Sequence, residues 1–480
     1  MNYRAVLNAV SALIVFVGIA MLVPFGVALG YREGDAVALG VSAVLTAGFG
    51  LLVFFLTRHP RELRVKDGFG VVCLGWTAMA VFGALPFLLS GSVVHFTDAV
   101  FETMSGFTTT GATILVDIEA VPRGVLFWRS FIQWIGGMGI IVLSLAILPM
   151  LGVGGMQLYR AEAPGPSPDK LTPRIRQTAA YLWVVYAVIS LAEAVALRFA
   201  GMDWFDSVCH TFTTMATGGF SPRNASVAAY DSAAVHWIMT FFMVLAGSNF
   251  ALHYRAWRSP RAYFSDLEWR TYAVILLVAT AIVGGVLVLR HGYEIEWAIR
   301  SAAFQVASIM TTTGYATDDY ELWAPGLRYL ILVLMFIGGC AGSTAGSVKV
   351  VRHVILAKAG IHEIEVAVNP RLVRGVQLGR GRRVDTEIVR NVMGFAVLYV
   401  GILGVSTGML SGLGFDLETA LSAATTCLAN VGPGLANVGP TDNFAWMGAS
   451  AKWLLTGLML VGRLEIYTVL ALLLPSTWKR

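Results

Sequence analysis

The chain has 480 residues, of which 56% are hydrophobic and only 13% are charged, and its mean hydropathy is +0.70. Soluble domains usually carry about 25% charged residues, so this composition excludes a soluble globular protein and indicates an integral membrane protein. The formal net charge of +5 is not a nucleic-acid signal, because the basic residues lie in short loops between apolar spans.

Two apolar segments open the chain, at residues 5–29 and 36–57, and a basic linker at 58–67 follows them. The first segment is too long for the core of a signal peptide, so we expect it to remain as a span. After the linker, an apolar span, a short Thr/Gly-rich re-entrant segment and a second apolar span recur four times. The span pairs are expected at 69–90 and 125–151, 177–200 and 233–256, 271–290 and 327–357, and 391–413 and 449–475.

This pattern predicts ten spans and four re-entrant pore loops. Non-helical backbone at membrane depth is tolerated only where protein covers it or water reaches it, so four such loops imply a shared aqueous axis. The predicted fold class is an all-α membrane protein, with four pseudo-repeated span–loop–span (M1–P–M2) units around a central pore and two extra N-terminal helices. The expected parts are an N-terminal helix pair (1–66), pore units 1, 2 and 3 (67–155, 156–258 and 259–358), and a cytoplasmic linker with pore unit 4 (359–480).

Four related turns occupy the re-entrant segments and recur at intervals of about 100 residues, which is the signature of a repeated architecture. Backbone carbonyls can replace the water around a bare cation when they face one axis, and glycine permits the positive φ that such a turn needs. The candidate ion-binding residues are Thr109, Thr110 and Gly111; Ala216, Thr217 and Gly218; Thr312, Thr313 and Gly314; and Asn430, Val431 and Gly432.

An acidic residue precedes each turn: Asp98, Asp206, Glu296, and Asp416 with Glu418. The residues between acid and turn are expected to form a short helix with the acid near its positive end. Its carbonyl end, equivalent to about half a negative charge, would point at the turn and favour a cation there. The alternative is four ordinary Thr/Gly loops, but four turns in matching positions favour a cation pore.

The second span of the third unit contains four glycines and three hydroxyl residues between Gly338 and Ser347. Each internal glycine costs about 1 kcal/mol relative to alanine, so a break in the helix is predicted, with close packing through small residues as the alternative. Arg463 lies in the last span, where a lone guanidinium costs about 2.5–3.5 kcal/mol. It is expected either to project into the pore or to pair with a buried acid such as Glu193, Glu102 or Glu465.

Most of the 34 Lys and Arg residues lie at the two termini and in the linkers 58–67, 156–178, 255–270 and 349–390. The positive-inside rule then places both termini in the cytoplasm and predicts that the turns enter from outside. The basic segment 349–390 either lies near anionic lipid or forms a docking surface, and its charge does not separate the two. Four scattered cysteines are expected to be small buried hydrophobes rather than disulfide partners or metal ligands: Cys73, Cys209, Cys340 and Cys427.

The four turns resemble the filter positions of the Trk/Ktr/HKT superfamily of potassium transport proteins. The matching motifs are TTTGAT at 108–113, MATGGFSP at 215–222, MTTTGYAT at 310–317 and LANVGPGLANVGP at 428–440. The leading span pair is similar to the extra N-terminal pair of the TrkH/TrkG branch. In this family a glycine at the filter position accompanies K⁺ selectivity, and all four turns carry one. The fourth turn departs most, through Asn430 and Val431, and is expected to coordinate an ion less regularly.

The resemblance implies a K⁺-selective pore in a bacterial cytoplasmic membrane, with K⁺ as the transported ion. It also implies a homodimer with one pore per protomer, and a cytosolic nucleotide-binding (NAD or ATP) TrkA-like regulatory subunit. The implied gate is an intramembrane loop below the filter, and an arginine of the family matches Arg463. The candidate gate residues are therefore Gly338, Gly339, Gly342, Ser343, Thr344, Gly346 and Arg463.

Two other functions compete with a channel-like pore. A K⁺/H⁺ or K⁺/Na⁺ symporter on the same frame remains the alternative, because either mechanism can share one filter. An enzyme is not expected, since His362-Glu363 lacks the second His of HExxH and no paired acids have usable spacing. No organic cofactor is expected in this chain, which has no GxGxxG within a strand–helix pattern, and no nucleic-acid partner is expected.

Overall fold

The computed structural model describes residues 1–58, 65–146, 171–371, 375–378 and 382–478. Within these ranges the regular structure is helical except for one two-stranded antiparallel sheet and one isolated bridge. In the sheet, β1 (Gln377–Leu378) pairs with β2 (Arg382–Arg383), with Gln377 opposite Arg383. The prediction of an all-α protein is confirmed.

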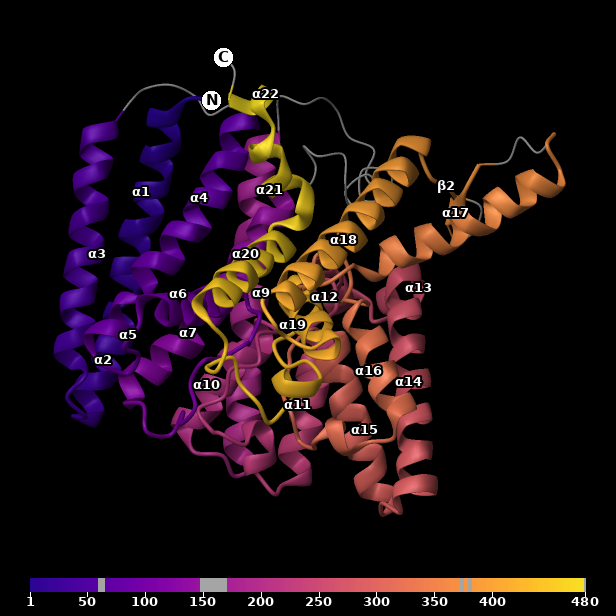
Figure 1. The fold of residues 1–480 in the computed structure, drawn as a ribbon, viewed down its shortest axis with the longest axis horizontal. Coiled ribbons are helices and arrows are strands. Elements are labelled where there is room, and N and C mark those ends of the chain that lie inside the picture. The colour runs from indigo at the N-terminus through magenta and orange to yellow at the C-terminus, as the bar shows by residue number, and fades with distance from the viewer. Residues whose placement is uncertain (59–64, 147–170, 372–374, 379–381, 479–480) are drawn as a thin grey trace.

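The N-terminal helices form one edge of the molecule, where Figure 1 shows α1, α3 and α4 side by side. The chain starts with α1 (Tyr3–Ala20) and α2 (Leu22–Tyr31), and turns back as α3 (Ala36–Thr57). A Cβ on Gly18 would lie only 2.6 Å from the backbone nitrogen of Ala47, so glycine permits the close approach of α1 and α3.

The remaining helices repeat one order, in which a first long helix, a short helix and a second long or broken helix follow one another. Unit 1 consists of α4 (Val65–Gly83), α5 (Leu85–Leu89), α6 (Phe96–Phe107) and α7 (Arg123–Ala146). Unit 2 consists of α9 (Leu171–Phe199), α10 (Trp204–Met215), α11 (Ala233–Ala246) and α12 (Phe250–Arg258), with a 3₁₀ turn, η2, at Ser226–Ala229.

Units 3 and 4 repeat this order. Unit 3 consists of α13 (Arg261–Ser265), α14 (Leu267–His291), α15 (Ile295–Met310), η3 (Tyr320–Leu322), α16 (Pro325–Met335) and α17 (Val350–Val368). Unit 4 consists of α18 (Thr386–Gly412), α19 (Leu417–Ala429), η4 (Ala436–Val438), α20 (Ala449–Arg463), α21 (Glu465–Leu473) and α22 (Pro475–Trp478).

Six helical stretches of the described chain are long and apolar enough to cross a membrane, and two bent helix pairs raise this number to eight. Both bent pairs are stretches that the sequence predicted as spans, with weaker small-residue marks at Gly247-Ser248 and Gly462. The pair α11 and α12 bends by 101°, and the pair α20 and α21 bends by 117°. The other two predicted spans fall on α7, whose predicted end at 147–151 lies outside the described residues, and on the interrupted stretch α16–α17.

Each bend coincides with a distinct feature of the backbone. After α11, the N–H of Phe250 donates to the carbonyl of Gly342 in unit 3 rather than to its own helix. After α20, Glu465 adopts a left-handed φ of 56°, which ends one helix and redirects the next. Each unit from the second to the fourth therefore has a second span that is bent or broken.

The two chain ends lie at the same end of the molecule, and α17 extends sideways from the same half (Figure 1). The rings of Tyr3 and Trp478 stack with centroids 6.0 Å apart, so the first and last helices are in contact. This arrangement agrees with the predicted placement of both termini on one side, together with the basic segment that follows unit 3.

Candidate ion pathway

Each of the four short helices ends where a predicted turn begins. The helices α6, α10, α15 and α19 end at Phe107, Met215, Met310 and Ala429. The predicted acids lie at their opposite ends, in the first turns at Asp98, Asp206, Glu296 and Glu418. The Asp416 carboxyl caps α19, and the hydrogen bonds that it accepts from Thr419 lower its pKa. The four carbonyl ends therefore converge on the four turns, as predicted.

The four turns share one backbone conformation. A residue with left-handed φ is followed two positions later by a glycine with positive φ. The first members are Thr109 (51°), Thr217 (53°), Thr312 (58°) and Asn430 (56°), and the glycines are Gly111 (86°), Gly219 (74°), Gly314 (83°) and Gly432 (99°). The residue between them donates to the carbonyl five positions earlier: Thr110 to Ser105 (2.8 Å), Gly218 to Thr213 (2.8 Å), Thr313 to Ser308 (2.8 Å) and Val431 to Thr426 (2.9 Å).

This repeat corrects the register of the second turn by one residue. The sequence places Ala216, Thr217 and Gly218 beside the other three triplets, but the matching triplet is Thr217, Gly218 and Gly219. The glycine equivalent to Gly111 is therefore Gly219, because it alone of the glycine pair has positive φ. The fourth turn keeps the shared backbone conformation in spite of its diverged sequence.

The four turns contact one another in chain order and close into a ring. A Cβ on Gly111 would overlap the carbonyl oxygen of Gly218, one on Gly219 that of Thr313, and one on Gly314 that of Val431. A Cβ on Gly432 would lie 2.6 Å from the carbonyl oxygen of Thr110, which returns to the first turn. We call residues 109–111, 217–219, 312–314 and 430–432 the turn ring. Glycine is required at these four positions both by φ and by the neighbouring carbonyl.

Side chains join the turns behind the ring. The amide of Asn430 donates through Nδ2 to Thr110 Oγ1 and to the carbonyl of Met459, each at 2.9 Å, and so links the fourth turn to the first. The hydroxyls of Thr108 and Thr110 are hydrogen bonded at 2.8 Å, and those of Thr311 and Thr313 at 2.7 Å. The uncharged hydroxyls therefore hold the turns without adding charge.

A buried ion pair that the sequence did not indicate links the first and second turns. Glu102 on α6 and Arg129 on α7 approach to 2.7 Å, with both side chains almost fully buried. The Glu102 carboxylate accepts hydrogen bonds from Thr113 Oγ1 and from the N–H of Ile114, just beyond the first turn. Arg129 donates to the carbonyl of Ser221 and lies 3.6 Å from the ring centroid of Phe220, just beyond the second turn. An arginine within an apolar span was the available signal.

The predicted break in the third unit is present between Met335, where α16 ends, and Val350, where α17 begins. Residues 336–349 form a closed loop, which we call the broken-span loop. Ile337 and Val348 form a parallel bridge, and the N–H of Gly338 donates to the carbonyl of Val348 at 3.0 Å. Glycine is needed at Gly342, whose φ is 77°.

The broken-span loop lies against the helix ends that carry the turn ring. Thr344 donates through Oγ1 to the carbonyl of Met215 at 3.0 Å, at the end of α10. The N–H of Gly346 donates to Thr312 Oγ1 at 2.6 Å, within the third turn. A Cβ on Gly346 would overlap the carbonyl oxygen of Ala429, at the end of α19. The candidate gate residues are thus in direct contact with three of the four turns or their helices.

Arg463 is the last residue of α20 and is buried, with 2% of its surface exposed. It donates through Nη1 to the carbonyl of Thr344 at 2.7 Å, in the broken-span loop. The three acids considered as partners do not pair with it in the described part of the chain. Glu102 pairs with Arg129 and Glu465 with Arg352, and Glu193 forms no ion pair with any described residue.

Glycines in the second spans allow the backbones of these spans to pack closely against the ends of the short helices. A Cβ on Gly136 would overlap the carbonyl oxygen of Phe107, and one on Gly462 would overlap that of Leu428. A Cβ on Gly137 would lie 2.8 Å from Ala216 Cα, and one on Gly247 would lie 2.8 Å from the Thr311 side chain. These contacts place the second spans directly behind the turn ring.

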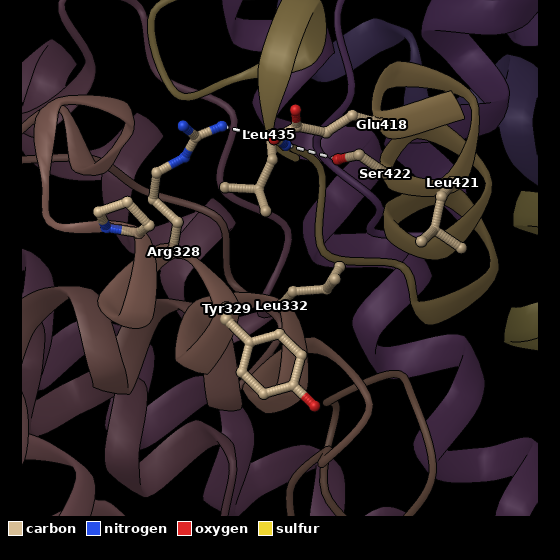
Figure 2. Close-up of a pocket in the computed structure, with 8 residues that line it drawn as sticks. Arg328, Tyr329, Leu332, Glu418, Leu421, Ser422 and Leu435 are labelled. Carbon is tan, nitrogen blue, oxygen red and sulfur yellow. Dashed lines mark hydrogen bonds and ion pairs between the residues drawn. The ribbon is translucent and has the colours of Figure 1, made fainter. Parts of the chain in front are cut away.

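A separate pocket of about 230 Å³ lies between α16 and α19, away from the ring. Figure 2 shows Arg328, Glu418 and Ser422 at one end of it, and Tyr329 and Leu332 at the other. Arg328 pairs with Glu418, while Ser422 accepts a hydrogen bond from the N–H of Leu435, beyond the fourth turn. These contacts join α16 of the third unit to α19, and α19 to the segment that follows the fourth turn.

The four cysteines are buried and unpaired, as predicted. Among the described residues, no group of three or more His, Cys, Asp or Glu side chains is arranged to hold a metal ion. The arrangement instead offers backbone carbonyls, hydroxyls and helix ends, which are the groups that bind a monovalent cation without a fixed negative charge.

Comparisons with known proteins agree with this geometry. Residues 38–478 match the family model of TrkH, described as cation transport protein. The Trk system potassium uptake protein TrkH of Escherichia coli (strain K12) is 42% identical over 485 residues, with all of both chains covered. The Trk system potassium uptake protein TrkG of the same strain is 34% identical, covering all of this chain and 99% of its own. The crystal structure of the potassium transporter TrkH from Vibrio parahaemolyticus superposes with a TM-score of 0.92 at 38% identity, with all of both chains covered.

Proposed function

Because this chain belongs to the TrkH family of cation transport proteins, we propose that it takes up potassium across the cytoplasmic membrane through a pore lined by the turn ring. The observation that carries this proposal is the closure of the ring, in which each glycine faces the carbonyl of the next unit. Closure brings carbonyl groups of four segments around one axis, which is the arrangement that replaces the hydration shell of K⁺.

The proposed ion-binding residues are those of the turn ring, with the second turn in its corrected register at Thr217, Gly218 and Gly219. The helix ends at Phe107, Met215, Met310 and Ala429 add the partial negative charge of four carbonyl termini. No carboxylate belongs to the ring. Selectivity among monovalent cations would then depend on ring geometry and carbonyl number rather than on net charge.

The proposed gate is the broken-span loop together with Arg463. Two features support this role: the loop contacts the third turn through Gly346, and it is tied to the fourth unit through Thr344 and Arg463. A fixed guanidinium charge beside the path of a cation raises the barrier to permeation where the dielectric constant is low. Release of the loop would lower that barrier.

Regulation, assembly and orientation are proposed from the family resemblance and from charge. We propose a homodimer, a cytosolic nucleotide-binding TrkA-like subunit that acts on the basic segment 349–390, and cytoplasmic termini. The broken-span loop continues directly into α17, which supports the action of the subunit on segment 349–390, since a partner bound there would pull directly on the loop. The relatives are named as proteins of a Trk system, which agrees with a transporter that works with other components.

Coupled K⁺/H⁺ symport is the second candidate, and one residue favours it. Glu193 on α9 is fully buried and forms no ion pair with any described residue, and the Thr214 side chain is its hydrogen-bonding neighbour. A buried carboxyl without a charged partner is the kind of group that takes up and releases a proton. Glu193→Gln separates the mechanisms: a channel keeps its K⁺ flux and its insensitivity to an imposed pH gradient, whereas a symporter that uses Glu193 loses proton coupling.

The proposed function is tested by complementation and by flux. A bacterial strain without its own K⁺ uptake systems should grow at low external K⁺ when it expresses this chain with a TrkA-like subunit. Purified protein in liposomes should then carry ⁸⁶Rb⁺ in competition with K⁺. Failure of both assays with well-folded protein would refute the proposal.

A further inference from the structure

One residue of the turn ring is a glycine for no reason in its own backbone. Gly218 occupies the position held by Thr110, Thr313 and Val431 in the other turns, and its φ is not positive. A side chain is therefore compatible with its conformation, as it is in the three equivalent residues. The reason for glycine must lie in what surrounds it.

The space beside Gly218 is filled by a side chain from another unit. A Cβ on Gly218 would overlap Cδ of Gln133 and would lie 2.8 Å from its Nε2. Gln133 belongs to α7, the second span of unit 1, and is fully buried. Its amide thus occupies the volume that a side chain on residue 218 would need.

The Gln133 amide also holds the second turn through its backbone. Nε2 donates to the carbonyl of Gly218 at 2.8 Å, and Oε1 accepts from the N–H of Phe220 at 3.2 Å. These two groups lie on either side of Gly219, the glycine with positive φ in this turn. The carbonyl of Gly218 is also the oxygen that a Cβ on Gly111 would overlap, so Gln133 controls the contact between the first two turns.

The other three second spans carry methionine at the matching position. Gln133 precedes the pair Gly136-Gly137 by three residues, and aligning the pair with Ala246-Gly247, Gly338-Gly339 and Gly462-Arg463 places Met243, Met335 and Met459 opposite it. All three methionines are fully buried. In three units the middle residue of the turn has a side chain and the aligned residue of the second span is methionine. In the remaining unit the middle residue is glycine and the aligned residue is glutamine.

We propose that Gln133 is a positioning residue for the ion-binding ring, which supplies to the second turn the side chain that Gly218 lacks and fixes the carbonyl of Gly218. The inference rests on the proposed function for its effect on ion preference. The pairing of Gln133 with Gly218 is a statement about packing and hydrogen bonding, and it is testable without transport.

The test compares four forms of the full chain: wild type, Gln133→Met, Gly218→Thr and the double variant. Either single change removes both hydrogen bonds, the first by deleting the amide and the second by displacing it. The preference for K⁺ over Na⁺, measured by competition against ⁸⁶Rb⁺ flux in liposomes, should fall about tenfold in each, the factor that corresponds to losing hydrogen bonds at a buried site. The double variant copies the pairing of the other three units, and it should recover most of the preference.

Thermal unfolding in detergent keeps the test independent of transport. The single variants should unfold at lower temperature than wild type, and the double variant should regain most of that loss. Met243→Gln, which puts an amide at the aligned position of the second unit, is the matched control, and it should gain no hydrogen bond to the second turn and no ion preference over wild type. Losses that simply add in the double variant, in both flux and unfolding, would overturn the inference. Wild-type protein without K⁺ preference but with recovery of stability in the double variant would instead refute the proposed function and retain the pairing.

Discussion

The guanidinium of Arg463 donates through Nη1 to the carbonyl oxygen of Thr344 at a distance of 2.7 Å. This bond joins the bend of the fourth unit to the broken-span loop of the third. Arg463 therefore has two properties that a gate requires: it contributes a fixed positive charge, and it holds the loop in one position. Nη2 also donates to a backbone carbonyl, that of Gly136 at 3.5 Å, and no acid among the described residues pairs with Arg463.

Arg463→Ala should raise basal K⁺ flux by at least about tenfold, because it removes both the charge and the bond to Thr344. Lowering the barrier to permeation by about 1.4 kcal/mol already corresponds to a factor of ten. Arg463→Lys keeps the charge and should give an intermediate flux. ⁸⁶Rb⁺ flux into liposomes and thermal unfolding are measured on the same preparations. A loss of stability without any gain in flux would show that Arg463 is only a structural residue.

Substitution of the ring glycines should weaken ion preference according to the corrected register. Gly111→Ser, Gly219→Ser and Gly314→Ser each place a Cβ against a carbonyl oxygen of the next turn and strain a positive φ. We expect the K⁺ over Na⁺ preference to fall at least about tenfold, since such backbone strain costs about 1–3 kcal/mol. Flux competition with K⁺ and Na⁺ checks this. Unchanged preference in a folded Gly219→Ser protein would contradict the register.

Changes in the broken-span loop should alter the basal K⁺ flux of the closed protein and leave its preference for K⁺ over Na⁺ nearly intact. Gly342→Ala strains a φ of 77° and brings Cβ to 3.1 Å from Asn249 Oδ1, while Gly346→Ala would overlap the Ala429 carbonyl. Both changes should displace the loop from the ends of the short helices. Basal flux without the regulatory subunit is the measurement. A loop variant that stays closed and is still fully activated by the subunit would rule out the loop as the gate.

Breaking the buried pair behind the first two turns should destabilise the fold. Glu102→Ala leaves Arg129 buried without its partner, and we expect a loss of about 3–5 kcal/mol. Glu102→Ala combined with Arg129→Met should recover most of it, because no uncompensated charge remains. Arg328→Ala, at a more exposed pair, is the control and should cost about 1 kcal/mol or less. Equal losses in Glu102→Ala and the double variant, measured by thermal unfolding in detergent, would contradict this account.

The sequence predicted those features that leave a local chemical pattern. Gly111, Gly314 and Gly432 recur visibly along the chain because their positive φ demands glycine. The dense glycines from Gly338 are visible because the φ of Gly342 and the close neighbours of the other three demand it. The register of the second turn is not visible, since Gly218 and Gly219 are adjacent and only their φ values distinguish them. The bend at Gly247 is also hidden, because it accompanies a bond to unit 3, and the bend at Leu464 is hidden because it appears only in the left-handed φ of Glu465.

Partners that are backbone groups or distant side chains escaped sequence reasoning for a different reason. Arg463 suggested a search for an acid, but its partners are carbonyls 119 and 327 positions away, and carbonyls are present at every residue. Gln133 contacts Gly218 across 85 positions and is a neutral residue within an apolar helix. Such pairings follow from the placement of α7 against the second turn, which only the folded chain specifies.

The turn ring is proposed to select the transported ion, and paired flux measurements test this role most directly. Wild type and Gly219→Ser are reconstituted at equal density, and inhibition of ⁸⁶Rb⁺ uptake by K⁺ and by Na⁺ is compared, with thermal unfolding as the control for folding. The account predicts that K⁺ competes far better than Na⁺ in wild type and that this difference is largely lost in Gly219→Ser, while uptake persists. Equal competition by K⁺ and Na⁺ in wild type, or an unchanged K⁺ advantage in folded Gly219→Ser, would contradict it.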